Sequence, residues 1–452
     1  MTSVKVFKPT KDALQLLTSN EAEMLPILKN AVKLVDKIFL LQERSINNGA
    51  NLYPRDATKK EIEEAAKKDP KILSPFTVVK RDKKNRLTTV DYHTEYKDQI
   101  QLIVNLLLEA QKICRNPSFK NYLKIISTAL PKGDYQKIDI AWLKLKESNL
   151  DLTIGPYERY LDKLFFVKKA FQGSLGIVDK KRTKQAKFVR DILYTTTGPR
   201  PHRVVPPSVV DVQIEESIIL AGFIGRAFFS RQHLPADTET TTKYGSRILG
   251  FLTPINYKFD ELIYPIFNAV FENNFRNRYT KDLLRKGNYH YVLLTAIAQQ
   301  LHRYRNSRTR LRELFPILDE ANCVASGIQL AKHQILKGAI NPKELEAIMI
   351  SQICWGFSEW IIYRKSNVRE DYLKGDALIF NFLVKAGALQ EKGGVSWPNF
   401  AKIFFEMENL SIIFVRLLEE GSYLKAQKFL SKYLSVDPFE VLRNKLVTIE
   451  PI

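Results

Sequence analysis

The chain has 452 residues, of which 45% are hydrophobic, 26% charged and 11% aromatic, so it is long enough for two or three globular domains. Its 70 Lys and Arg residues outnumber its 49 Asp and Glu residues, and the formal net charge of +21 favours anionic partners. No apolar run reaches the roughly 18 to 20 residues of a membrane helix, so we expect no membrane partner.

The cysteines and the first residues bear on the compartment. Cys114, Cys323 and Cys354 form no CxxC pair and no even-numbered framework, which is typical of a reducing compartment. The first 17 residues lack the apolar segment of a signal peptide. We therefore expect a cytoplasmic protein, and the sequence leaves an organellar or nuclear location open.

Helical periodicity marks the beginning of the chain. Apolar residues recur at helical spacing in Asn20–Glu43, and Asp98–Arg115 and Pro117–Leu130 are two further predicted helices. These three segments predict a helical layer before any strand of the core.

The period then changes. The short segments Asn149–Gly155 and Gln172–Val178 favour strands and are bounded by glycine. Val204–Val212 and Ser217–Phe229 continue this β or mixed character, and long helical segments dominate from Phe259 onward. The pattern predicts an α+β fold that is predominantly helical, with a boundary near residues 260 to 285.

One segment has a specific family signature. Asp151–Phe165 reads DLTIGPYERYLDKLF and resembles the IGPYExYEDxLF segment of the dipeptidyl peptidase III family of zinc exopeptidases, especially its shorter bacterial members. Weaker matches occur in the family's order, so the resemblance covers roughly residues 50 to 435: Asn51–Asp56, Ser74–Asp82, Leu234–Asp237, Gly245–Arg247, Arg310–Asn322, Phe380–Leu383 and Gly387-Ala388.

The resemblance implies a two-lobed fold with a cleft between the lobes. One lobe would hold a small β-barrel core and the other would be helical. On this basis we expect an N-terminal helical segment at residues 1–48, a mixed lobe with the β core at 49–285, and a helical lobe with the zinc-motif helices at 286–452.

The zinc helix of the family corresponds to Tyr289–His302, and its metal ligands are missing. In one alignment the motif falls on Leu294, Thr295 and Ala298. In the other, His302 is the second histidine, its partner is Ala298 or Ile297, and Gln299 or Ala298 replaces the general base. Glu320, preceded by Asp319, falls where the family has its third ligand.

This set of residues predicts that zinc and catalysis have been lost. A zinc site normally takes three protein ligands, and neither alignment keeps two imidazoles. A glutamine cannot accept a proton from water, so Gln299 is at most a vestigial catalytic residue. We therefore expect no cofactor, with His302 and Glu320 as remnants. The alternative is a metallopeptidase or hydrolase with a rearranged metal site that uses His302 and Glu320, with His290 and His333 as candidates for a further ligand.

The peptide-binding residues of the family are also altered. Its Asn-x-Pro-Asn segment reads His233-Leu234-Pro235-Ala236, and an acidic residue that would hold the peptide's amino terminus reads Gln172. Glu158 and Tyr160 persist, and the resemblance implies that Tyr160 would support an oxyanion. Both could instead hold a turn at a strand end. We take Glu158, Tyr160 and His233 as candidate ligand-binding residues, and the first two also as vestigial catalytic residues.

An arginine-rich segment follows the altered zinc helix. It contains Arg303, Arg305, Arg308, Arg310 and Arg312 and no acid. Guanidinium groups bind carboxylates and phosphates, so the segment predicts a ligand that is an acidic peptide, an acidic protein, a phosphate or a nucleic acid. The alternatives are a solvated loop, or a basic structural subunit of a nucleoprotein assembly. No RRM, KH or zinc-finger pattern is present, and the sequence indicates no oligomeric state.

Overall fold

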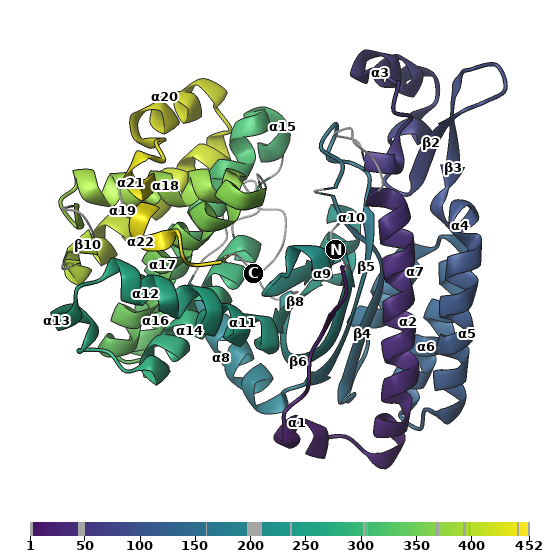
Figure 1. Cartoon of the computed structure of the whole chain (residues 1–452), viewed down its shortest axis with the longest axis horizontal. Helices are drawn as coiled ribbons and strands as arrows, with labels where there is room; N and C mark the ends of the chain where they lie inside the picture. Colours follow the sequence, from purple (N-terminus) through teal and green to yellow (C-terminus); the bar gives the residue numbers. More distant parts are fainter. Residues whose placement is uncertain are drawn as a thin grey trace. The chain divides into compact units, whose positions relative to one another are not determined.

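The computed structural model describes residues 3–43, 50–159, 161–196, 210–235, 237–301, 304, 306–366, 370–391, 395–396, 398–440 and 443–450. The chain forms two compact units (Figure 1). Unit 1 consists of Met1–Thr183 and Gln213–Thr253, and unit 2 of Lys184–Val212 and Pro254–Ile452. The bounds differ from the segments expected from sequence because the chain passes from one unit to the other three times.

A curled, half-barrel sheet is the centre of unit 1. The strand order is β4-β5-β6-β8-β7, and β1 pairs with β6. Neighbours β4/β5, β5/β6 and β7/β8 are antiparallel. The strand bounds are β1 Lys5–Val6, β4 Leu150–Glu158, β5 Ala170–Val178, β6 Val210–Gly222, β7 Arg231–Leu234 and β8 Ser246–Phe251.

Helices α2 (Ser19–Glu43) and α6 (Pro117–Ala129) pack on the apolar face of this sheet, and α5 (Lys97–Ile113) packs against both helices (Figure 1). The buried residues of α2 recur every three or four positions, so one stripe of the helix faces the core. At Gly173 of β5 an added Cβ would lie 3.3 Å from Val35 Cγ2 of α2, so the glycine allows close packing. The three helices predicted from periodicity are confirmed.

The opposite face of the sheet is polar and buried. Side chains alternate between the two faces of a strand, so Asp151 and Thr153 of β4 share this face with Gln172 and Ser174 of β5. Thr153 and Ser174 hydroxyls lie 2.7 Å apart across the two strands. β6 adds Glu215 and Ser217, which are fully buried. The buried interior on this side of the sheet is therefore lined by polar side chains.

Shorter elements complete unit 1. A hairpin forms from β2 and β3, and α8 begins in unit 1 and ends in unit 2. Strand character in Val204–Val212 was expected, and the described strand begins at Val210; Ser217–Phe229 is a strand to Gly222 and then a helix. The bounds are α1 Lys11–Gln15, η1 Ala50–Leu52, α3 Lys59–Lys68, η2 Pro70–Leu73, β2 Thr77–Arg81, β3 Leu87–Asp91, α4 Tyr92–Glu95, η3 Leu130–Lys132, α7 Tyr135–Leu143, α8 Lys180–Thr196, α9 Phe223–Ala227 and α10 Thr238–Tyr244.

Unit 2 is almost entirely helical, as expected. Its core consists of α14 (Lys281–Leu301), α16 (Phe315–Leu336), α17 (Pro342–Ser366), α18 (Glu370–Lys385) and α19 (Phe400–Glu420). The other elements are α11 Leu252–Lys258, η5 Phe259–Ile263, α12 Tyr264–Val270, α13 Asn273–Arg276, α15 Ser307–Leu311, η6 Arg312–Leu314, β9 Gln390–Glu391, β10 Val395–Ser396, α20 Tyr423–Tyr433, α21 Asp437–Glu440 and α22 Arg443–Leu446.

The expected fold class, α+β and predominantly helical, is confirmed. The sheet is a half-barrel and not a closed barrel. Among the described residues, none of the helices has the length and apolar character needed to cross a membrane.

Candidate functional site

The first alignment of the zinc motif falls on a buried part of α14. Leu294, Thr295 and Ala298 are all buried. The Thr295 hydroxyl donates to the Tyr291 carbonyl at 2.9 Å, one turn earlier on the same helix. A Cβ added at Gly327 of α16 would lie 3.0 Å from the Thr295 backbone nitrogen. Helices α14 and α16 are therefore in close contact at Thr295, and none of the three side chains is of a type that usually binds zinc.

The second alignment of the zinc motif involves the end of α14 and His302. Ile297 and Ala298 are fully buried and apolar, and Gln299 is half-buried. His302 lies outside the described residues, as do Tyr160, Arg303 and Arg305. The geometry of a site at His302 therefore stays a prediction.

Glu320 and Asp319 lie in the second turn of α16, and both are half-buried. Gly375 of α18 packs next to them, because a Cβ added there would be 3.5 Å from Glu320 Cβ. The first turn of α16 contains no acid, and helix-dipole stabilisation falls off within that turn. Favourable interaction with the helix dipole is thus a weak explanation for the presence of a glutamate at position 320. Cys323 is buried.

The other candidate histidines have different neighbours. His290 lies near Glu344 and Lys286, and burial lowers its pKa to about 4. His333 is on α16, thirteen residues after Glu320, which is about 20 Å of helix. His333 and Glu320 therefore cannot share one metal ion. Within the described part of the chain, no group of three or more His, Cys, Asp or Glu residues is placed to hold a metal.

The peptide-binding candidates lie at the polar side of the sheet. Glu158 ends β4, and its Oε1 accepts a hydrogen bond from the Arg159 backbone at 2.8 Å, which supports a role in the turn. The strand period places Glu158 and Gln172 on the same face of the β4/β5 pair. Gln172 is fully buried, and neither amide atom has a hydrogen-bond partner among the described residues. His233 is half-buried in β7, opposite Ile248 of β8.

The described arginines of the basic segment contact unit 2 itself. Arg308 stacks on Phe315, with 5.1 Å from the guanidinium carbon to the ring centroid. Arg310 donates to the Glu420 and Glu419 carbonyls at 2.8 and 3.0 Å, at the C-terminus of α19. Arg312 lies 5.8 Å from the Tyr423 ring. These contacts give the three side chains structural roles that the sequence did not reveal.

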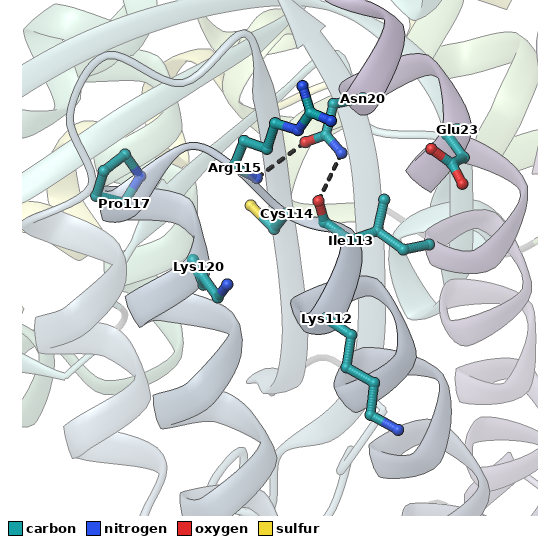
Figure 2. A pocket seen from close by; sticks show the side chains of 8 residues that line it. All are labelled: Asn20, Glu23, Lys112, Ile113, Cys114, Arg115, Pro117 and Lys120. Atoms are coloured by element: carbon teal, nitrogen blue, oxygen red, sulfur yellow. Dashed lines mark hydrogen bonds between the residues drawn. The ribbon is translucent and has the colours of Figure 1, made fainter.

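Unit 1 also contains a basic cavity that the sequence did not reveal (Figure 2). It has a volume of about 580 Å³ and lies where α2 and α6 begin and α5 ends. Asn20 shapes it by donating to the Ile113 carbonyl at 2.5 Å and accepting from the Arg115 backbone at 2.9 Å. No ion pair of the described residues involves the three cations that line it, Lys112, Arg115 and Lys120. One acid, Glu23, also lines the cavity.

Solved structures of dipeptidyl peptidase III have this fold. The enzyme from Caldithrix abyssi superposes with a TM-score of 0.85 over 97% of this chain and 94% of that one, at 24% identity. The enzyme from Corallococcus sp. strain EGB gives a TM-score of 0.80 over 99% and 93% of the two chains, at 20% identity. The fold expected from the segment Asp151–Phe165 is confirmed, and the chain has a dipeptidyl peptidase III-like fold.

A sequence relative has a different name. The protein described as Nudix hydrolase 3 from Arabidopsis thaliana is 24% identical over 424 residues, which are 86% of this chain and 54% of that protein. This chain thus spans about half the length of that relative. No family model matches the sequence.

Proposed function

We propose that this chain is a catalytically inactive, dipeptidyl peptidase III-like protein that acts by binding a peptide or an acidic protein partner. The observation that supports the proposal most strongly is the contact between α14 and α16. The motif positions Leu294, Thr295 and Ala298 are buried, Thr295 lies at this contact, and none of the three side chains is an imidazole, carboxylate or thiolate that would bind zinc. The dipeptidyl peptidase III-like fold supports retention of the scaffold.

The altered peptide-binding residues suggest the kind of peptide. The resemblance assigns backbone contacts of a bound peptide to the segment that begins at His233 in β7. An imidazole can donate or accept a hydrogen bond in place of an amide. Gln172 is neutral where an acid would hold a cationic amino terminus, and the chain's net charge is +21. The neutral amide of Gln172 and the positive net charge both favour an acidic peptide over a basic one.

Binding of matched peptides tests this proposal. Fluorescence anisotropy would compare acidic, neutral and basic peptides of equal length, first with the wild type and then with His233→Ala. Gln101→Ala on the exposed face of α5 is the control. We expect the acidic peptide to bind most tightly, His233→Ala to weaken it several-fold, and Gln101→Ala to have no effect. Equal affinity for the three peptides, or no binding, would refute the proposal.

A rearranged metallohydrolase is the second candidate. Glu320 supports it because this carboxylate is retained at the family's third-ligand position. It requires zinc and His302. A third candidate is a basic structural subunit of a nucleoprotein assembly, and the three cations of the basic cavity support it. Zinc content with peptidase assays tests the second candidate, and salt-dependent binding to DNA tests the third.

A further inference from the structure

The three passages of the chain between its units all involve one short segment of β6. The passages are Thr183/Lys184, Val212/Gln213 and Thr253/Pro254. In unit 1, the Ile214 backbone donates to the Thr183 hydroxyl at 3.0 Å, and the Ser217 backbone donates to the Thr253 hydroxyl at 3.1 Å. Residues 213–217, which we call the junction segment, therefore hold the unit 1 side of all three passages.

Glu215 lies at the centre of the junction segment and is fully buried. Its carboxyl group packs on Gly176 of β5, where an added Cβ would be 2.5 Å from Glu215 Cδ. Neither carboxyl oxygen has a hydrogen-bond partner among the described residues. A buried carboxylate without donors is strongly destabilising, whereas a neutral carboxyl group in the same place costs much less.

The charges around Glu215 do not compensate a negative charge there. Asp151 of β4 lies across Gly176 in the strand register and adds a second acid. Trp142 Nε1 donates to Asp151 at 3.1 Å, and Arg247 of β8 stacks on Trp142 at 4.8 Å. Burial raises the pKa of Asp151, and the charge of Arg247 opposes this rise only in part.

The remaining charged groups near the junction have other neighbours. Asp139 of α7 interacts with Lys169 and Asp237. Asp179, which follows β5, pairs with Arg182 at 2.6 Å. Glu216 accepts from the Thr10 hydroxyl at 2.8 Å. No cation is paired with Glu215 in the described structure. Burial first, and then the charge of Asp151, raise the pKa of Glu215 well above its ordinary value.

We propose that Glu215 is a proton-operated latch of the junction segment: the neutral carboxyl group keeps residues 213–217 in place, and loss of its proton to solvent releases them. The folded state then binds one proton more than the unfolded state between the two pKa values of Glu215. The stabilisation is fully present below the ordinary carboxyl pKa and is lost as the pH rises toward the raised one. The latch therefore opens on the alkaline side.

Hydrogen exchange of the junction segment tests the latch. Exchange of a peptide covering residues 213–217 would be followed by mass spectrometry from pH 5 to 9, with correction for the intrinsic rate. We expect protection in the wild type to fall at least several-fold as the pH rises, and protection in Glu215→Gln to stay constant. Glu216→Gln, the adjacent and solvent-accessible acid, is the matched control and should behave like the wild type. Equal pH dependence in Glu215→Gln and the wild type would overturn the proposal.

A measurement on the wild type covers the case in which Glu215→Gln fails to fold. The pKa values of Glu61, Glu313, Glu346 and Glu420 are lowered, in contrast to that of Glu215. Carbon-13 labelling of glutamate Cδ, with the Glu215 resonance assigned, should thus show that this resonance titrates far later than those of the four residues. If all glutamate resonances complete their titration together near the ordinary pKa, the latch does not exist.

Discussion

Gly327 of α16 lies against the backbone of Thr295 in α14, and a Cβ at this glycine would be 3.0 Å from the Thr295 nitrogen. The contact occurs at the position where the first motif alignment would place a catalytic or ligating side chain. A small residue on one helix and a self-bonded threonine on the other let the two helices pack closely. Close helix packing thus occupies a position to which the sequence resemblance assigns a metal-site residue.

Gly327→Ala should destabilise unit 2. The added methyl group requires α14 and α16 to separate, and overpacking of this kind costs about 1–3 kcal/mol. Urea unfolding measures the change. The matched control is Gly356→Ala in α17, where the nearest atoms would be at an ordinary 3.4 Å. Because alanine favours a helix interior, the control should be neutral or stabilise by about 0.5–1 kcal/mol. Equal effects of the two substitutions would contradict the close contact.

Arg310→Ala should lower stability without changing polyanion binding. Its guanidinium donates to two carbonyls at the end of α19, and loss of such hydrogen bonds costs about 0.5–1.5 kcal/mol for an exposed group. Thermal unfolding and DNA affinity would be measured on the same sample. If DNA affinity falls while the melting temperature stays constant, Arg310 is a ligand-binding residue as the sequence first suggested.

Removal of the cations in the basic cavity should weaken polyanion binding and leave stability nearly unchanged. Lys112, Arg115 and Lys120 have no described acidic partner, so their replacement by alanine should leave stability within about 0.5 kcal/mol. Each phosphate contact that is lost should reduce the slope of log affinity against log salt by about 0.9 for duplex DNA. Filter binding at several salt concentrations measures the slope. An unchanged slope would show that the cavity is not where a polyanion binds.

His290 should make stability depend on acid pH. Its folded pKa, about 4, is below the ordinary value of 6.5, so the folded state binds fewer protons. The stabilisation is complete above pH 6.5 and is lost as the pH falls toward 4, by about 3 kcal/mol at most. His290→Gln should weaken this loss in urea unfolding measured at pH 7 and 4.5. If the variant keeps the full wild-type pH dependence, the loss comes from other groups.

Local patterns predicted much of the fold. The spacing of apolar residues predicted α2, α5 and α6, and the segment Asp151–Phe165 predicted a dipeptidyl peptidase III-like fold. The bounds of the two units were not predictable in the same way. They depend on β6 returning to pair with β5 after the chain has contributed to unit 2, and a linear pattern does not show that pairing.

The candidate site was less predictable because its side chains act over long sequence separations. Arg310 reads as part of a basic run, but its partners are 109 and 110 residues away. The basic cavity is organised by Asn20, which is 93 residues from its partner Ile113. Glu215 belongs to an ordinary strand sequence, and only the sheet register places Gly176 beneath it. A family resemblance offers no help where this chain departs from the family pattern.

Zinc analysis coupled to an activity assay tests the central claim most directly. The chain would be purified, equilibrated with zinc, freed of loose metal by gel filtration, and assayed with a dipeptidyl arylamide substrate. The inactive scaffold should retain far less than one zinc ion per chain and release no arylamine above the rate of a Glu320→Ala control. Stoichiometric zinc together with dipeptide release that Glu320→Ala abolishes would contradict the account and favour the rearranged metallohydrolase.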